Sequence, residues 1–376
     1  MSKPLPPGST IGLLGGGQLG RMIALEGRSL GYRFVCWDPV AGAPSAAVCD
    51  DAVTAPFDDP AAKTRFAELC DVITFEWENV PAELVEQLQT KCPVRPDASV
   101  LAVVQDRLIQ RQFLSKHGFP QTEYRSVDSR ARLEDALKSI GTPSILKTRR
   151  HGYDGKGQTP LRSAQDAAAL PDALHHILEK RVSFVKEISV VLARTEDGKT
   201  ATFPVAENVH RNGILHTTLA PARVPASVER QAALLAVSIA NELEHVGVMA
   251  VEMFWLGGEG NDQVLVNEIA PRVHNSGHYT WGACRTSQFE QHVRAVAGLP
   301  LGDVTQHTPA VMINLLGDVW AKGEPDWSAA LSRGAKLYLY GKEQAKPGRK
   351  MGHLLLLGDA ERSLAQADEL LRLLAR

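Results

Sequence analysis

Short apolar segments alternate with helical segments through the first hundred residues, and this alternation limits the possible fold more than any other feature. Residues 10–14 read as a buried strand, a glycine loop follows at residues 15–20, and residues 21–30 have helical periodicity. Residues 32–37 and 72–75 repeat the strand pattern and end at Asp38 and Glu76. Because strands that alternate with helices form right-handed parallel crossovers, we predict a doubly wound α/β domain. Ligands are expected at the carboxyl ends of its strands.

The rest of the chain has a different pattern. A boundary is expected near residues 93–96, followed by a helix at residues 106–117. Residues 144–161 read as strand, glycine loop, strand. Residues 181–192, 202–206, 247–255 and 263–270 read as strands of a larger antiparallel sheet, with helices at residues 228–245 and 289–297. From about residue 301 the tail adds short strands, a basic loop at residues 346–350 and a leucine-rich helix.

Composition excludes several classes of protein. The net charge of −2 over 376 residues gives no support for a nucleic-acid or membrane surface. The five cysteines are odd in number and scattered, which favours a reducing compartment over a disulfide or zinc framework. No apolar run approaches the roughly 20 residues of a membrane span, and the first residues lack the apolar core of a signal peptide. The expected setting is the cytoplasm.

The first glycine loop matches a dinucleotide fingerprint, Gly15-x-Gly17-x-x-Gly20. The start of the following helix offers N–H groups to a phosphate. Asp38 ends the next strand, about where a ribose-binding acid would lie. Gln18 is either a polar contact or exposed. The alternative is a tight turn without any nicotinamide ligand.

A second glycine loop lies between the strands at residues 144–161. Gly152, Gly155 and Gly157 accompany Lys156, and Lys147 precedes them inside an apolar strand. Backbone N–H groups and lysines suit the phosphates of a nucleotide. The alternative is a solvated hairpin, although a charge at Lys147 requires an anionic partner.

Carboxylates interrupt three later strands. Glu179 and Glu187 could bind ribose hydroxyls or pair with a lysine such as Lys186. Glu252 and Glu268 lie on successive predicted strands, and two carboxylates beside a triphosphate form a magnesium site. The alternatives are a shared proton or a pair with Arg272. Asn267 points away from Glu268 unless the strand ends there.

Residues 264–278 hold the densest polar cluster of the chain. An apolar strand leads into Asn267, Glu268, Arg272, His274, Asn275 and His278. Buried carboxylates and imidazoles are costly unless something pairs with them. We therefore interpret this segment as the floor of an active site.

The order of strand lysine, glycine loop and paired glutamates resembles the ATP-grasp ligases. Longer segments resemble the N5-carboxyaminoimidazole ribonucleotide synthetase family over nearly the whole chain. These are GGQLGRM at 16–22, FEWENV at 75–80, QDRL at 105–108, GYDGKGQ at 152–158, NEIAPRVHNSGH at 267–278 and KPGRKMGH at 346–353. The resemblance implies an N-terminal pre-ATP-grasp α/β domain at residues 1–105, a central lid domain at 106–181, and a mostly antiparallel C-terminal catalytic domain with its tail at 182–376.

The same resemblance implies a reaction. ATP, with Mg²⁺, would phosphorylate bicarbonate to carboxyphosphate. Carboxyphosphate, or CO2 released from it, would then carboxylate 5-aminoimidazole ribonucleotide (AIR) in purine biosynthesis. A homodimer is expected from the family, with no nucleic-acid or membrane partner.

The site residues that the resemblance implies fall into sets. The ATP-binding set is Arg107, Lys147, Gly152, Tyr153, Asp154, Gly155, Lys156, Gly157, Gln158, Glu179, Lys180, Arg181, Val182, Glu187, His210, Asn267 and Glu268. The substrate-binding set is Gly17, Gln18, Leu19, Glu76, Tyr153, Asp154, Arg272, His274, Asn275, Arg349 and Lys350. Arg272, Lys350, His274 and Asp154 are the implied catalytic residues, and Glu252 and Glu268 the implied magnesium ligands.

Several alternatives stay open. A formate-dependent glycinamide ribonucleotide transformylase would share the architecture. An NAD-dependent oxidoreductase would use only the first glycine loop, and a non-catalytic ATP-binding protein would keep the fold. Glu76 and Glu78 either bind a ligand or cap a turn, and His210 is either a nucleotide contact or exposed beside a hairpin turn. His278 and Trp281 are read as packing residues.

Overall fold

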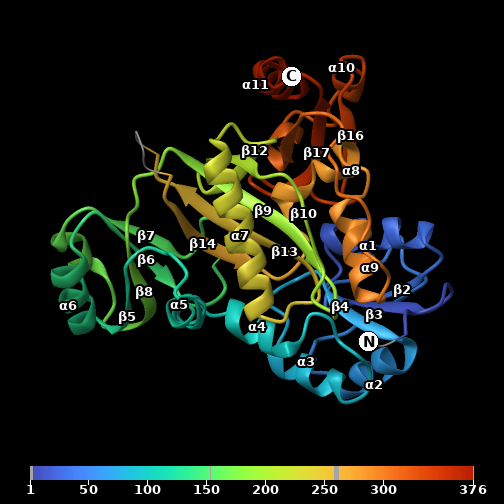
Figure 1. Ribbon diagram of the computed structural model, residues 1–376, viewed down its shortest axis with the longest axis horizontal. Helices are drawn as coiled ribbons and strands as arrows, with labels where there is room; N and C mark the ends of the chain where they lie inside the picture. The colour runs from blue at the N-terminus through green and yellow to red at the C-terminus, as the bar shows by residue number, and fades with distance from the viewer. Residues whose placement is uncertain (1–2, 153, 258–261, 376) are drawn as a thin grey trace.

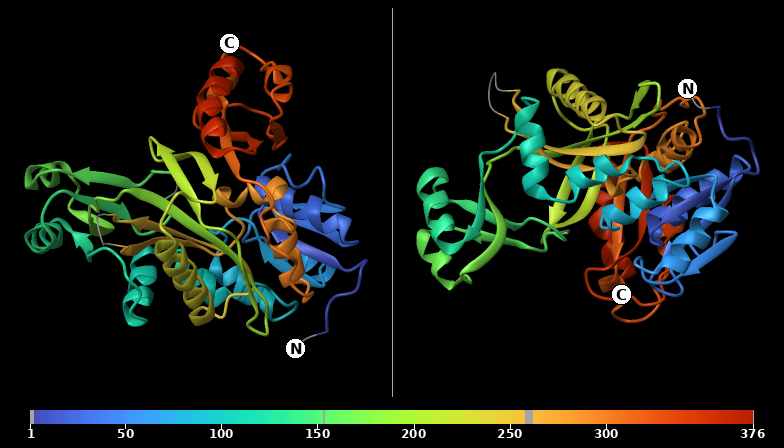
Figure 2. Two further views of the ribbon diagram at one scale, coloured as in Figure 1. Left: turned by 45° about the horizontal axis from the view of Figure 1, so that its top comes forward. Right: turned by 90° about the horizontal axis from the view of Figure 1, so that it is seen from below.

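Three β-sheets organise the computed structural model, which describes residues 3–152, 154–257 and 262–375. Figure 1 shows the small sheet of the central segment as a separate lobe, and Figure 2 shows the same lobe from two further sides. The large sheet lies between this lobe and the N-terminal unit.

The N-terminal unit is a parallel four-stranded sheet in the order β3-β2-β1-β4. Its elements are β1 (Thr10–Leu14), α1 (Gln18–Ser29), β2 (Arg33–Asp38), β3 (Asp51–Thr54), α2 (Pro60–Leu69), β4 (Val72–Phe75), α3 (Ala82–Gln89) and α4 (Ala98–Val104). Alternate residues of β2 pack on opposite faces: Phe34 lies with α1, and Val35 with α2. The predicted doubly wound domain is confirmed. Leu14 pairs with Phe75, so the segments after β1 and β4 emerge side by side.

The central lobe is an antiparallel sheet in the order β5-β8-β6-β7. Its elements are α5 (Arg107–Lys116), β5 (Tyr124–Ser129), α6 (Arg130–Ile140), β6 (Ser144–Thr148), β7 (Gln158–Leu161), η1 (Ala164–Ala169) and β8 (Ala173–Lys180). The Asp106 side chain accepts hydrogen bonds from the Leu108 and Ile109 amides and so caps α5. The predicted helix at 106–117 and the strand, loop, strand pattern at 144–161 are both confirmed.

The large sheet is antiparallel and follows the path β14-β13-β9-β11-β12-β15-β17-β16, with β10 beside β9. Its strands are β9 (Lys186–Arg194), β10 (Thr200–Thr202), β11 (Ala206–Arg211), β12 (Ile214–Ala220), β13 (Gly247–Trp255), β14 (Val264–Ala270), β15 (Ala310–Leu316), β16 (Lys336–Leu339) and β17 (Lys350–Leu357). The helical segments are α7 (Ala226–Glu242), η2 (Asn275–Gly277), α8 (Thr280–Ala283), α9 (Gln288–Val296), η3 (Gly317–Trp320), α10 (Trp327–Leu331) and α11 (Ala360–Leu374). The predicted larger antiparallel sheet is confirmed.

Two strand predictions are wrong in part. Residues 181–185 link β8 to β9, because β8 belongs to the small sheet and β9 to the large one. The strand expected at residues 202–206 stops at Thr202, and Ala206 already begins β11. Phe203 and Val205 are buried, so this apolar run reflects core packing between strands.

The N-terminal unit and the large sheet share one hydrophobic core. Ile23 of α1 and Phe289 of α9 belong to the same buried cluster. A Cβ atom at Gly27 would lie 2.3 Å from Phe34 and 3.0 Å from Val293, so the close approach of α1 requires glycine. Among the described residues, no helix is both long and apolar enough to cross a membrane. The five cysteines are free thiols.

Candidate active site

Two carboxylates hold the glycine loop after β1. The Gly16 amide donates to Asp38 Oδ2 over 2.7 Å, and the Gly17 amide donates to Glu76 Oε1 over 2.8 Å. A Cβ atom at Gly17 would lie 2.8 Å from the same Glu76 oxygen. Asp38 is thus committed to the loop, which removes the basis for a dinucleotide interpretation. Of the two residues after Gly17, Leu19 is buried in the core, so only its backbone can face a ligand.

Glu76 and Glu78, after β4, meet the polar segment after β14. Burial raises the pKa of Glu76, against which the Gly17 amide and Arg272 act. Arg272 Nη2 lies 2.8 Å from Glu78 Oε2. Arg272 Nε is buried without a hydrogen-bond partner among the described residues, so the guanidinium retains a donor. Glu76 braces the loop and Glu78 pairs with Arg272.

Lys147 does have the anionic partner that the sequence requires, but it is a glutamate of this chain. Lys147 Nζ lies 2.6 Å from Glu179 Oε2, and Arg111 Nε lies 2.7 Å from Glu179 Oε1. All three side chains are at most 8% exposed. Burial alone would raise the pKa of Glu179, but the two cations outweigh it and lower the pKa to about 2. Burial lowers the pKa of Lys147.

Sequence reasoning missed Arg111. It lies four residues after Arg107 on α5, so both guanidinium groups project from one side of the helix. Arg107 Nη1 lies 3.3 Å from Glu268 Oε2, and its Nη2 donates to the Gly152 carbonyl over 3.2 Å. The i, i+4 spacing was the available signal.

The second glycine loop docks on the turn between β11 and β12. A Cβ atom at Gly155 would lie 3.0 Å from Gly213 Cα, so two backbones nearly touch there. Asn212 and Gly213 both have positive φ, which confirms the predicted hairpin turn. Asp154 Oδ1 accepts from Lys350 Nζ over 2.8 Å. Tyr153, expected in both binding sets, lies outside the described residues.

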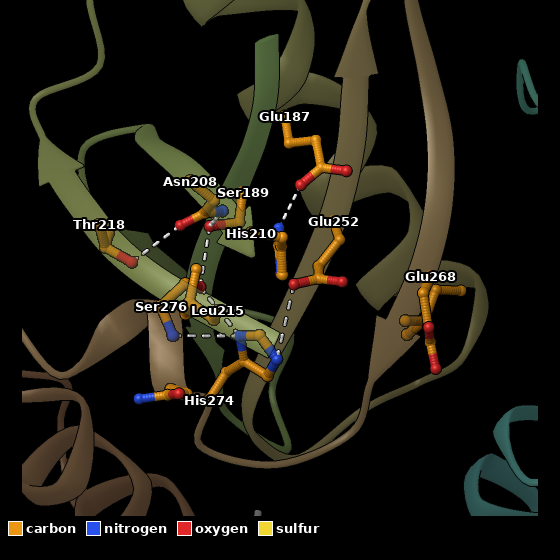
Figure 3. A network of polar contacts seen from close by, with 12 residues as sticks. Glu187, Ser189, Asn208, His210, Leu215, Thr218, Glu252, Glu268, His274 and Ser276 are labelled. Carbon is orange, nitrogen blue, oxygen red and sulfur yellow. Dashed lines mark hydrogen bonds and ion pairs between the residues drawn. The ribbon is translucent and has the colours of Figure 1, made fainter. Parts of the chain in front are cut away.

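Acidic groups converge beside this turn (Figure 3). His210 Nδ1 is hydrogen-bonded to Glu187 Oε2, so His210 is no stray surface residue. Burial opposes the resulting increase in the pKa of His210, which is nevertheless raised because Glu187 and Glu252 attract the proton. For the carboxyl group of Glu252, burial and the negative charge of Glu268 together raise the pKa to about 7.

Glu252 and Glu268 are cross-strand partners on β13 and β14. The register shifts after this pair, so that Met253 faces Val266 and Asn267 is the extra residue of a β-bulge. The bulge explains why both Asn267 and Glu268 stay partly exposed within a continuing strand. Among the described residues, no group of three His, Cys, Asp or Glu side chains is arranged to hold a metal ion. A cation here would need ligands besides the Glu252 and Glu268 carboxylates.

Lysines around the C-terminal basic loop add cations to the site. Besides Lys350, these include Lys342, whose Nζ donates to the Lys350 carbonyl over 2.7 Å. Burial lowers the pKa of Lys342 to about 8, and Arg349 acts in the same direction. Lys342 was not predicted, since nothing in its local sequence separates it from a surface lysine. Arg349 is exposed, and its Nη1 donates to the Gln344 carbonyl.

His274 lies within 3.8 Å of Glu252, measured from Nε2 to Oε1. Burial, Arg272 and Lys350 hold the pKa of His274 well below its ordinary value. The neighbouring Asn275 exchanges two hydrogen bonds with Asn314, at 3.1 and 2.8 Å. His278, read as a packing residue, is indeed buried.

Three predicted ATP-binding residues lie at the edge of the charged groups described above. Lys180 is half exposed and pairs with Glu123 at 3.4 Å. Arg181 is exposed and Val182 partly so, in the link between the two sheets. Phe184 of the same link stacks on Phe254 with ring centroids 4.6 Å apart, which gives this edge an apolar wall.

Three protein families match consecutive parts of the chain. The ribonucleotide synthetase preATP-grasp domain matches residues 9–105, the ATP-grasp domain residues 112–289, and the phosphoribosylaminoimidazole carboxylase C-terminal domain residues 310–367. The N5-carboxyaminoimidazole ribonucleotide synthase of Bacillus subtilis is 43% identical over 96% of this chain and 95% of its own.

Solved structures that resemble this chain come from the same family. An ADP complex of N5-carboxyaminoimidazole ribonucleotide synthetase superposes with a TM-score of 0.91 at 41% identity, covering 99% of this chain and 98% of the other. The synthase of Aspergillus clavatus in complex with ADP and AIR has a TM-score of 0.87 at 30% identity, covering 98% and 99%.

Proposed function

Because this chain belongs to the N5-carboxyaminoimidazole ribonucleotide synthase family of ATP-grasp proteins, we propose that it carboxylates AIR at the expense of ATP. The products would be N5-carboxyaminoimidazole ribonucleotide, ADP and phosphate. One observation carries the proposal. Glu268 and Arg272, four residues apart, belong to two different charge clusters that meet at the end of β14.

The first cluster suits ATP. Arg107 and Lys147 would hold phosphate oxygens, and the loop at residues 152–158 would cover them, with Lys156 and Gln158 among its donors. Lys147 already lies against Glu179, so a phosphate would enter as a further acceptor for its ammonium group. Because the Glu179 side chain is held by Arg111, adenine would meet the backbone of residues 179–182 instead. Glu187 would bind the ribose, with His210 as its partner.

The carboxylates of Glu252 and Glu268 fit a magnesium ion. Both are hard oxygen donors on adjacent strands, and burial together with the neighbouring Glu268 raises the pKa of Glu252, which a bound cation would counteract. With only two protein carboxylates, the remaining ligands would be phosphate oxygens and water, as Mg²⁺ prefers. When bound, the ion would neutralise charge on the transferring phosphoryl group. Asn267, on the bulge, would assist.

The second cluster suits AIR and bicarbonate. Arg272 and Lys350 would bind the anionic carboxyl group, with His274 and Asn275 beside them. Asp154 would orient Lys350, to which it is already bonded. The loop at residues 17–19, Glu76, Arg349 and Lys342 would line the place for the ribonucleotide. Closing the glycine loop would exclude water from carboxyphosphate, an acyl phosphate that water hydrolyses.

The decisive experiment is release of ADP from ATP in Mg²⁺ and bicarbonate, with and without AIR. AIR should stimulate release and N5-carboxyaminoimidazole ribonucleotide should form. Absence of stimulation would sink the proposal. Replacing bicarbonate with formate, and AIR with glycinamide ribonucleotide, tests the transformylase alternative in the same assay.

Two further proposals follow from the family. The chain would act as a homodimer in the cytoplasm. Light scattering during gel filtration would give the mass of the particle, and a monomeric mass at enzyme concentrations used in the assay would contradict the first.

A further inference from the structure

A buried chain of hydroxyl and amide groups runs from β12 to the imidazole of His274 (Figure 3). Thr218 Oγ1 lies 2.9 Å from Asn208 Oδ1, Asn208 Nδ2 lies 2.9 Å from Ser189 Oγ, and Ser189 Oγ lies 2.8 Å from Ser276 Oγ. Ser276 Oγ then lies 2.9 Å from His274 Nδ1. The side chains that lead to His274 are at most 5% exposed, so no bulk water competes for these bonds; they are Thr218, Asn208, Ser189 and Ser276.

The backbone of Ser276 fixes the direction of the chain. Its amide also donates to His274 Nδ1, over 3.3 Å. An amide N–H can only donate, so Nδ1 must be an acceptor and carries no hydrogen. The Ser276 hydroxyl therefore donates to Nδ1 as well, accepts from Ser189, and the same order continues back through Asn208 to Thr218. In the opposite order Nδ1 would carry a hydrogen, and that hydrogen would face the hydrogen of the Ser276 amide.

We propose that this chain is a positioning device that keeps His274 as the neutral tautomer with its hydrogen on Nε2. Nε2 points toward Glu252, 3.8 Å from Oε1, which is too long for a direct hydrogen bond. The Nε2–H group therefore remains a donor for an oxygen atom bound between Arg272, Lys350 and Glu252. In the proposed reaction, on which this role rests, that oxygen belongs to bicarbonate or carboxyphosphate.

The consequence is chemical. A ring that donates through Nε2 can stabilise negative charge on the carboxyl group that is transferred. It cannot take a proton from the AIR amine through the same atom, and it cannot ligate a metal ion through it. Ser276, Ser189, Asn208 and Thr218 are then positioning residues, because they act through His274 and touch no substrate.

The tautomer can be read directly in the resting protein. In ¹⁵N-histidine-labelled chain, long-range proton–nitrogen NMR separates protonated from unprotonated ring nitrogens, and His274→Asn identifies the His274 signals by their loss. The expected result is a protonated Nε2 and an unprotonated Nδ1. A protonated Nδ1 would overturn the proposal, whether or not the chain carboxylates AIR.

Variants test the chain itself. Ser276→Ala removes the shorter of the two hydrogen bonds to Nδ1, at 2.9 Å, and leaves only the 3.3 Å bond from the backbone amide. The tautomer with hydrogen on Nδ1 should then become detectable, and kcat should fall about tenfold, the effect of losing one hydrogen bond, with KM for ATP unchanged. Ser276→Thr should restore both properties. Thr218→Val keeps the shape of the side chain at the end of the chain farthest from His274. It should lower kcat roughly two- to threefold, less than Ser276→Ala, because Thr218 strengthens the bond to His274 only through its neighbours. Thr217→Val, the adjacent buried threonine outside the chain, is the matched control and should change neither property.

The outcomes distinguish failure of the positioning role from failure of the proposed reaction. If Ser276→Ala and Thr218→Val leave both tautomer and kcat as in the unmodified protein, the hydroxyl chain has no positioning role. If the tautomer responds as expected but AIR does not stimulate ADP release, the positioning chain stands and the proposed reaction fails.

Discussion

Replacing Glu179 with glutamine tests a buried charge cluster of the central lobe. Glu179 bridges Lys147 and Arg111 at 2.6 and 2.7 Å, with about 4% of its side chain exposed. Glutamine keeps the shape of the side chain but removes its charge, and it leaves two cations buried without an anion. Breaking such a pair from one side is much more costly than never having built it.

The magnitude follows from the pKa of Glu179, which is lowered from 4.5 in the unfolded chain to about 2 in the folded protein. At about 1.4 kcal/mol per pKa unit, ionised Glu179 contributes about 3 kcal/mol to the free energy of unfolding. This agrees with the roughly 3–5 kcal/mol expected when a buried ion pair loses one partner. Since the folded pKa is the lower one, the contribution is fully present above pH 4.5 and is lost as the pH falls toward 2.

Urea denaturation at pH 7 measures the difference, with Glu123→Gln as the matched control. Glu123 pairs with Lys180 at 3.4 Å, with both side chains more than half exposed, so its loss should cost less than about 1 kcal/mol. The difference between the unmodified protein and Glu179→Gln should shrink below pH 4.5. Equal destabilisation by the two substitutions at pH 7, or a difference that stays constant down to the lowest pH at which the chain folds, would refute the reasoning.

Three further predictions concern activity. Glu268→Gln should abolish magnesium-dependent ADP release while far-UV circular dichroism stays unchanged, because it removes one proposed metal ligand and the partner of Arg107; activity near normal would contradict the metal assignment. Gly17→Ala should raise KM for AIR about tenfold, because the added Cβ atom would lie 2.8 Å from Glu76 and displace the loop. An unchanged KM would show that the loop does not bind AIR. The pKa of Lys342 is lowered to about 8, so KM for AIR should rise as the pH passes 8 and lose that dependence in Lys342→Met, measured by initial rates.

The central lobe shows where prediction from sequence stopped. Lys147, a charge inside an apolar strand, correctly signalled an anionic partner. Within the chain that partner is Glu179, because β8 lies beside β6, and the expected nucleotide phosphate stays a prediction. Arg111 completes the cluster from α5. Strand order and helix docking are non-local, so no window of sequence contains this triad.

Local patterns predicted where charged and polar groups gather. The glutamates at residues 252 and 268 and the polar run at residues 267–278 were singled out because such groups are costly in apolar surroundings unless something pairs with them. The sheets follow from periodicity, and the parallel order of the first unit follows from its alternation of strands and helices.

Tertiary structure alone decided which groups meet. It brings Asp154 to Lys350 and Glu78 to Arg272, pairs that are 196 and 194 residues apart in the chain. It closes the first glycine loop on Glu76 and aligns four buried polar residues behind His274. A sequence determines which side chains carry charge and which segments form strands. The register and order of those strands determine which acid neutralises which base, because Coulomb and hydrogen-bond energies depend on distances of a few ångströms that only the folded chain sets.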